Sequence, residues 1–323
     1  MAVFDVGVLA LDESLGEGDI AALLADLQAS RSTAVGVSRG PLSSRFDALG
    51  EALLLSLVPE ADESARWQVG VEDVDVAAQL LQTAITHAPT ATQVLDRLLR
   101  ITAMASIEDG LTAESLAYSM LMAGAEHRRW LSTHSRKPIP EPAQPPILLE
   151  RTDAVLRITL NRPERHNAFG AAVRDGLAEA FDLVALDPSI ERVELRGAGR
   201  SFCSGGDLDE FGLTEDVALA HLIRVDRSVA ARIARVADRV GVELHGACIG
   251  AGIELASYAS RVTAHPDAVI RLPEVAMGLI PGAGGTVGIT KRIGRWRTAY
   301  LAVTGVPLDL PTALRWGLVD DLA

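Results

Sequence analysis

The chain has 323 residues, of which 48% are hydrophobic, enough for one large or two modest domains that each bury a core. Its formal net charge of −13 argues against nucleic acid or an anionic membrane as a main partner. The two cysteines, Cys203 and Cys248, are too few for a disulfide framework, no apolar run is long enough to span a bilayer, and the N-terminal residues lack the features of a signal peptide. We therefore expect a cytoplasmic protein.

Residues 1–76 are expected to form an N-terminal α/β appendage. Apolar, β-branched runs predict strands over residues 6–11 and 33–37, and the segment between them predicts a helix over 18–29. Together these elements make a short βαβ pattern. No residue in this region indicates a function.

Residues 77–137 are expected to be helical. Apolar positions such as Leu95 and Leu99 recur at helical spacing, and Pro89 and Gly110 are expected to separate the helices. A basic and proline-containing stretch ends this segment.

A proline-rich linker is expected over residues 138–147, because five prolines within eleven residues cannot continue a helix or a central strand. Beyond it, residues 148–323 alternate between strands and helices. The pattern predicts strands over 154–160 and 193–196 and a helix over 168–185, with glycine and aspartate at the turns. Such alternation predicts an α/β fold for this domain.

Two glutamates, Glu254 and Glu274, lie 20 residues apart, each in a segment marked by glycine or proline: GACIGAGIELA and IRLPEVAMGLIPGAGGT. Taken singly, each carboxylate could simply complement the dipole at a helix start. Taken together, two carboxyl groups beside exposed backbone amides suit the addition of water to an activated double bond. One group takes a proton from water and the other supplies a proton to carbon, because two nearby carboxyls divide their proton affinities.

Neither glycine-rich segment matches a nucleotide-binding pattern. Leu255 stands where the dinucleotide fingerprint requires a third glycine, and the stretch 282–286 lacks the Gly-Lys-Ser/Thr ending of a P-loop.

Five segments, in their order and spacing, resemble the crotonase (enoyl-CoA hydratase/isomerase) superfamily: the two glutamate segments, LNRPERHNAF at 160–169, GRSFCSGGDLDEF at 199–211 and TGVPLDLPTALRWGLVDDL at 304–322. The resemblance covers roughly residues 148–323. It implies a crotonase-like spiral of ββα units, a homotrimer or hexamer, and an acyl-CoA thioester substrate, as in fatty acid metabolism. It implies no metal and no redox cofactor, with coenzyme A present only as part of the substrate.

The resemblance also implies roles for individual residues. Glu254 would chiefly be the base that activates water, and Glu274 chiefly the acid that protonates the α-carbon. The backbone amides of Gly206 and Ala251 would form the oxyanion hole, although a glycine is commonest in the family at the second position. Arg165 could contact a coenzyme A phosphate or be a solvated loop arginine. The segments implied to bind coenzyme A contain Arg165, Asn167, Ala168, Phe169, Ser204, Gly205, Asp207 and Leu208.

The order of segments departs from the family. The family core normally continues past the GLVDDL-like segment into helices that cover the active site and pack between subunits, whereas this sequence ends at Ala323. Residues 77–137 resemble that missing tail, so we expect them to replace it and to pack against the core. The alternative is an unrelated helical appendage. If the replacement holds, residues 1–60 could be a degenerate half-unit of a duplicated crotonase.

The function implied is hydration of a 2-trans-enoyl-CoA to a 3-hydroxyacyl-CoA. One alternative is an enoyl-CoA double-bond isomerase, but family isomerases typically depend on the carboxylate at the Glu274 position alone, so retention of Glu254 favours a hydratase. The other alternative is a non-catalytic acyl-CoA-binding subunit, which would need neither carboxylate. Fold alone does not separate these reactions.

Overall fold

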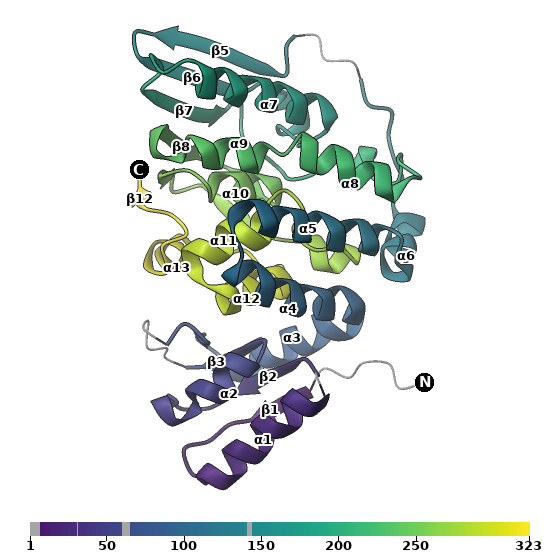
Figure 1. Ribbon diagram of the computed structural model, residues 1–323, viewed down its shortest axis with the longest axis vertical. Coiled ribbons are helices and arrows are strands. Elements are labelled where there is room, and N and C mark those ends of the chain that lie inside the picture. The colour runs from purple at the N-terminus through teal and green to yellow at the C-terminus, as the bar shows by residue number, and fades with distance from the viewer. Residues whose placement is uncertain (1–6, 31, 60–64, 141–143) are drawn as a thin grey trace.

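The computed structural model describes residues 7–30, 32–59, 65–140 and 144–323. The chain runs from a small N-terminal sheet at one end of an elongated molecule, through four helices, to a larger core (Figure 1). The first strands of the core lie farthest from that sheet, and the C-terminus lies between the two. Within the described residues, no helix combines the length and the apolar character needed to cross a bilayer.

The N-terminal region is a four-stranded parallel sheet in the order β1-β2-β3-β4. Its elements are β1 Gly7–Ala10, α1 Glu17–Ser30, β2 Ala34–Val37, the 3₁₀ turn Ser44–Phe46, α2 Asp47–Ala52, β3 Leu55–Val58 and β4 Gln68–Gly70. The predicted βαβ pattern corresponds to its first half, although Val6 lies outside the described residues. The sequence did not indicate β3 and β4, because β3 is buried on both faces and so lacks the alternation that marks a half-buried strand.

Four helices follow: α3 Val74–His87, α4 Pro89–Met104, α5 Ile107–Met122 and α6 Ala125–Thr133. Pro89 is the first residue of α4, as expected for a residue without a backbone N–H. The expected helix break at Gly110 is wrong. Ser106 caps α5 instead, and Gly110 lies inside the helix where a Cβ would approach Cγ2 of Val287 to 2.9 Å. The glycine therefore permits close packing on the core.

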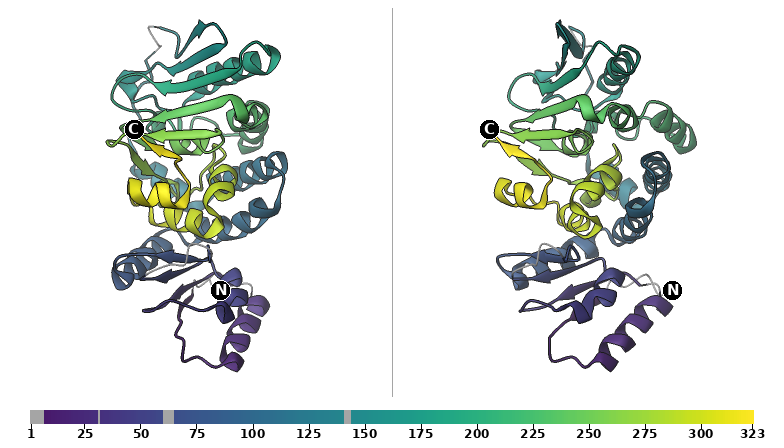
Figure 2. Two further views of the ribbon diagram at one scale, coloured as in Figure 1. Left: turned by 90° about the vertical axis from the view of Figure 1, so that its left-hand side faces the viewer. Right: turned by 60° about the vertical axis from the view of Figure 1, so that its left-hand side comes forward.

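These helices lie against the core in a defined order. Helix α3 contacts α12, α4 contacts α11 and α12, and α5 contacts α8 and α11. Figures 1 and 2 show α4 and α5 along one side of the segment that contains α11 and α12. A buried hydrogen bond of 2.7 Å from Oγ1 of Thr102 to the carbonyl of Thr286 joins α4 to the start of α11.

The core contains a six-stranded sheet in the order β12-β10-β8-β7-β6-β5 and a two-stranded sheet β11-β9. Only the β5–β6 pair is antiparallel among the described strands; the others are parallel. The strands are β5 Ile147–Thr152, β6 Val155–Leu160, β7 Arg192–Gly197, β8 Val240–Leu244, β9 Ala247–Ile249, β10 Arg261–Ala264, β11 Val269–Arg271 and β12 Asp321–Leu322. The sequence did not indicate β5, an edge strand whose last four residues are exposed.

The core helices are α7 Ala171–Leu186, α8 Val217–Asp226, α9 Val229–Arg235, α10 Ala251–Ala256, α11 Gly285–Ile293, α12 Arg295–Thr304 and α13 Leu310–Trp316. Helix α7 corresponds to the one predicted over 168–185, and its predicted apolar face, which includes Val173, Leu177 and Phe181, is buried. The linker is irregular over residues 134–140, and residues 141–143 lie outside the described part. The α/β class predicted for this domain is confirmed.

Candidate active site

A cavity of about 240 Å³ lies between the upstream helices and the core. Its wall contains four of the predicted functional residues: Gly206, Ala251, Glu254 and Glu274. They come from three segments of the core that are separated in sequence, and Tyr118 of α5 lines the same cavity. The fold therefore brings together the two carboxyl groups and the two backbone amides that the sequence singled out.

Glu254 lies in the first turn of α10 and is 2% exposed. Its Oε2 accepts hydrogen bonds of 2.8 Å from the backbone amides of both Ala283 and Gly285. Burial raises the pKa of Glu254 well above its usual range, and the charges of Glu274 and Glu114 raise it further. The two amide donors act in the opposite direction, because they stabilise the carboxylate.

A third carboxyl group holds the turn that carries these amides. Glu114 of α5 is 2% exposed, and its oxygens accept from the amides of Gly284 and Thr286 at 2.7 and 2.9 Å. The hydroxyl of Thr286 donates to it as well, at 2.7 Å. Four consecutive amides, 283 to 286, thus alternate between Glu254 and Glu114. Burial raises the pKa of Glu114 to about 7.

Glu274 begins the 3₁₀ turn Glu274–Met277, with Pro273 as its N-cap rather than as its first residue. Its Oε2 is buried and has no hydrogen-bond partner among the described residues. Burial raises the pKa of this carboxyl to about 8. Oε1 lies close to Gly250, where a Cβ would approach it to 2.3 Å. The Glu274 carboxyl therefore lies beside the turn that leads into α10, and its pKa favours the protonated form at neutral pH.

Two backbone amides face the same cavity. Gly206 follows Gly205, which has a φ of 94°, and Ala251 is the first residue of α10. The loop around Gly206 is held by Phe169, whose amide donates to Gly205 O at 2.7 Å and whose carbonyl accepts from Asp207 N at 3.3 Å. Within the described part of the chain, no protein acceptor receives the amide of Gly206 or Ala251. Both are available to a bound oxygen.

The remaining predicted coenzyme A residues are distributed differently. Phe169 and Asp207 line the cavity. Asn167 is fully buried, and its side chain bonds to the backbone of Arg162 in its own loop and of Ser201 in the loop after β7.

The Arg165 guanidinium lies 2.5 Å from Asp207 and 2.7 Å from Asp209. Its side chain is 17% exposed, so the alternative of a solvated loop arginine is wrong. The other members of the predicted set, Ala168, Ser204, Gly205 and Leu208, belong to the same two loops and do not line this cavity.

The sequence missed the residues that the upstream helices contribute. Tyr118 and Met122 of α5 and His127 of α6 line the cavity, and Glu114 supports it from behind. Burial lowers the pKa of His127, which bonds to the carbonyl of Met277 at 3.0 Å. One signal was present: Glu114 lies four positions before Tyr118, so a carboxylate shares a helix face with an aromatic residue.

Among the described residues, no group of three or more His, Cys, Asp or Glu side chains is arranged to hold a metal ion. The chemical groups that converge on the cavity are carboxyls with raised pKa values and unpaired amides. Carboxyl groups with raised pKa values that share a pocket with free backbone amides are typical of sites for acid–base chemistry.

Comparison with known proteins identifies the family. The sequence model for enoyl-CoA hydratase/isomerase matches residues 150–323. The chain is 31% identical over 176 residues to the 2,3-dehydroadipyl-CoA hydratase of Escherichia coli K12, which covers 54% of this chain and 68% of that protein. It is 34% identical over 178 residues to the 1,2-epoxyphenylacetyl-CoA isomerase of the same strain, with the same coverage of 54% and 68%.

A solved structure agrees. The crystal structure of an enoyl-CoA hydratase from Mycobacterium smegmatis matches with a TM-score of 0.52 at 30% identity, covering 56% of this chain and 70% of that one. The chain therefore belongs to the enoyl-CoA hydratase/isomerase family and is an enzyme of that family. These comparisons confirm the predicted crotonase resemblance and its fold.

Proposed function

We propose that this protein hydrates a 2-trans-enoyl-CoA to a 3-hydroxyacyl-CoA. The observation that carries the proposal is the convergence of Glu254 and Glu274 on the same cavity as the amides of Gly206 and Ala251. The thioester oxygen would accept from both amides while negative charge builds on it. Each such donor can lower a barrier by about 3 kcal/mol.

The two carboxyl groups would divide the proton transfers. Glu254 takes a proton from water as the water oxygen bonds to the β-carbon, the double-bond electrons move towards the thioester oxygen, and Glu274 gives its proton to the α-carbon. The hydrogen bonds support this assignment, because two amides stabilise the Glu254 carboxylate whereas Oε2 of Glu274 has no donor among the described residues. Protonation of Glu274 also removes one of the charges that raise the pKa of Glu254.

The upstream helices would complete this site. Tyr118, Met122 and His127 supply part of the cavity wall, which supports the proposal that residues 77–137 do the work of the covering helices of the family. The mechanism uses only side chains and backbone amides of this chain, with coenzyme A as part of the substrate. A cytoplasmic homotrimer or hexamer remains the expected assembly, and light scattering would measure it.

Double-bond isomerisation is the second candidate, because the family whose model matches includes enoyl-CoA isomerases. The intact Glu254, held by two amides, favours hydration, because only water addition needs both carboxyl groups. A non-catalytic acyl-CoA-binding subunit would gain nothing from burying either group.

The test is hydration of crotonyl-CoA, followed by the loss of enoyl-thioester absorbance. Glu254→Gln and Glu274→Gln should each lower kcat by at least roughly 100-fold, because the amide keeps the shape but cannot transfer the proton. Glu191→Gln, on an exposed loop, is the matched control. A Glu254→Gln variant that still converts 3-enoyl-CoA to 2-enoyl-CoA would establish the isomerase instead, and normal hydration by Glu274→Gln would exclude the proposed mechanism.

A further inference from the structure

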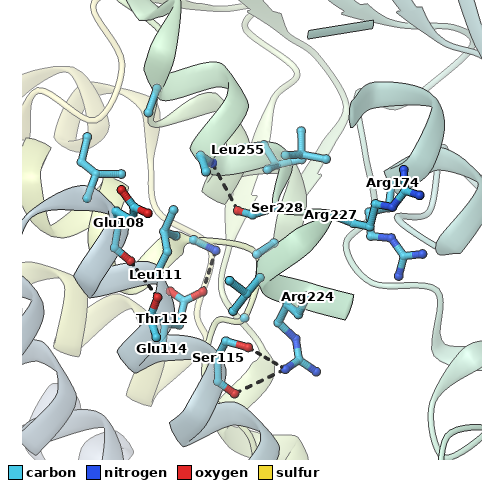
Figure 3. Close-up of a pocket in the computed structure, with 18 of the residues that line it drawn as sticks. Glu108, Leu111, Thr112, Glu114, Ser115, Arg174, Arg224, Arg227, Ser228 and Leu255 are labelled. Atoms are coloured by element: carbon cyan, nitrogen blue, oxygen red, sulfur yellow. Dashed lines mark hydrogen bonds between the residues drawn. The ribbon is translucent and has the colours of Figure 1, made fainter. Parts of the chain in front are cut away.

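A second cavity, of about 340 Å³, adjoins the candidate active site. It lies between α5, the segment from α8 to α9, and Leu255 of α10, as the close-up in Figure 3 shows. The two cavities share part of their walls: Phe169, Arg174, Arg224, Gly282 and Ala283 line both. A ligand whose reacting carbons lie in the first cavity can therefore extend into the second.

The wall of the second cavity is rich in positive charge. Arg174, Arg224, Arg227 and Arg235 line it, against two glutamates, Glu108 and Glu114. Glu114 is already bonded to the amides of Gly284 and Thr286, and Glu108 is exposed. The rest of the lining is largely apolar and includes Ile107, Leu111 and Leu255, so the cavity suits a hydrocarbon chain that ends in a negatively charged group.

Arg224 is the most informative of these arginines. Its Nη1 donates to the hydroxyl groups of Ser115 and Ser119 at 3.1 and 3.0 Å, and the guanidinium lies 4.5 Å from the ring centroid of Tyr118. All of these partners are neutral. Among the described residues, no carboxylate lies within ion-pair distance of it. Burial lowers the pKa of Arg224, whereas Tyr118 and the charge of Glu114 act in the opposite direction, although Glu114 lies beyond ion-pair distance.

The other three arginines are less deeply placed. Arg174 pairs with its neighbour Asp175 at 2.9 Å, and Arg227 pairs with Asp226 at 3.5 Å in a largely exposed contact. Arg235 is exposed at the end of α9. Figure 3 shows Arg174 and Arg227 close to each other on one side of the cavity, with Arg224 below them. Their charges add to the field that an anion entering the cavity would experience.

A partly buried cation without a charged partner is costly unless a ligand supplies the opposite charge. We propose that the second cavity receives the distal part of an acyl group that carries its own carboxylate, and that Arg224 binds this carboxylate. The inference rests on the proposed function, because it extends the acyl-CoA substrate beyond its reacting carbons. The substrate class is then the enoyl-CoA thioester of a dicarboxylic acid.

A phosphate of coenzyme A is the other possible source of an anion. The loops implied to bind coenzyme A contribute Phe169, Gly206 and Asp207 to the first cavity but only Phe169 to the second. Coenzyme A and the acyl chain extend in different directions from the thioester, so the arginine-lined cavity lies on the acyl side. A substrate pair that differs only in the terminal group separates the two sources.

The experiment compares trans-2-hexenoyl-CoA with the six-carbon thioester that carries a terminal carboxylate. For each protein the measured quantity is the ratio of kcat/KM for the carboxylate substrate to kcat/KM for the neutral one. Arg224→Gln should lower this ratio by roughly 10- to 100-fold, the effect of losing one charge-assisted hydrogen bond. Arg232→Gln is the matched control, because Arg232 pairs with Asp182 at 2.9 Å, lines neither cavity, and should leave the ratio unchanged.

An unchanged ratio in Arg224→Gln would overturn the inference. If the ratio is unchanged because both substrates lose activity equally, the arginine is assigned to coenzyme A. If Arg224→Gln does not fold, the exposed pair Arg227→Gln and Arg235→Gln must lower the ratio, more strongly at low ionic strength, for the inference to stand.

Binding of the saturated six-carbon thioesters, with and without the terminal carboxylate, makes the same comparison by calorimetry without any reaction. If the wild-type protein hydrates neither enoyl thioester, the proposed hydratase function is refuted. If it still binds the carboxylate form more tightly through Arg224, the anion subsite stands; if it shows no preference, the subsite is excluded as well.

Discussion

Replacing Glu114 by glutamine tests how far the upstream helix α5 controls the catalytic turn. The carboxylate accepts two backbone amides and one hydroxyl from Gly284 and Thr286. A glutamine side chain has one accepting oxygen, and its NH₂ group would face a donor, so one or two buried donors lose their partner. Each unsatisfied donor costs about 1–3 kcal/mol, so we expect the free energy of unfolding to fall by about 2–4 kcal/mol.

The same substitution should also change the rate of the reaction and its pH dependence. Glu254 is held by the intervening amides of the same turn, so a displaced turn should lower kcat more than it raises KM. The charge of Glu114 also raises the pKa of Glu254, and its loss should move the acid limb of the pH–rate profile to lower pH. A purely structural role would not move that limb.

Urea unfolding and the pH dependence of kcat measure both effects. Glu108→Gln is the control, because Glu108 lies on the same helix and is exposed. If Glu114→Gln retains wild-type stability and an unmoved acid limb, the turn does not depend on this carboxylate, and the reasoning fails.

Three further predictions concern Glu274, Gly250 and the upstream region. Burial raises the pKa of Glu274 from 4.5 to about 8, so the native state binds the extra proton and its stability should fall as pH rises through that range. Glu274→Gln should make this fall smaller, as thermal unfolding at several pH values would reveal, and the raised pKa values of Glu114 and Glu254 account for the fall that remains. Gly250→Ala should lower the free energy of unfolding by at least about 2 kcal/mol and remove most of the activity, because a non-glycine residue at φ 50° is strained and its Cβ would meet Glu274. The control Gly18→Ala lies in open space on α1 and should be neutral or stabilising in the same unfolding assay. A protein that starts at Pro146 would expose the apolar faces that α3–α6 cover and should aggregate or lose activity, and a soluble, fully active truncation in gel filtration and hydration assays would contradict the role given to those helices.

Several features could be read from local patterns. The apolar spacing of Val173, Leu177 and Phe181 predicted α7, because a helix buries one face at a period of 3.6 residues. The family motifs around Glu254 and Glu274 predicted a shared site, since their order and spacing are carried by the sequence itself. Local patterns failed at β3, which is buried on both faces, and at Gly110, whose reason lies in its contact with Val287 rather than in its neighbours along the chain.

The sequence by itself determined the family, the α/β class and the pair of candidate carboxyl groups, because these depend on residue types at fixed spacings. Only the tertiary structure decided what surrounds that pair. Glu114 and Arg224 come from helices more than 100 residues apart, and each is ordinary in its own sequence context. Burial in a shared wall changes both: one becomes a buried carboxylate that holds the turn beside Glu254, and the other a cation whose partners are all neutral. The energetic effect of a charge depends on how deeply the group is buried and on which groups surround it, and the linear sequence specifies neither.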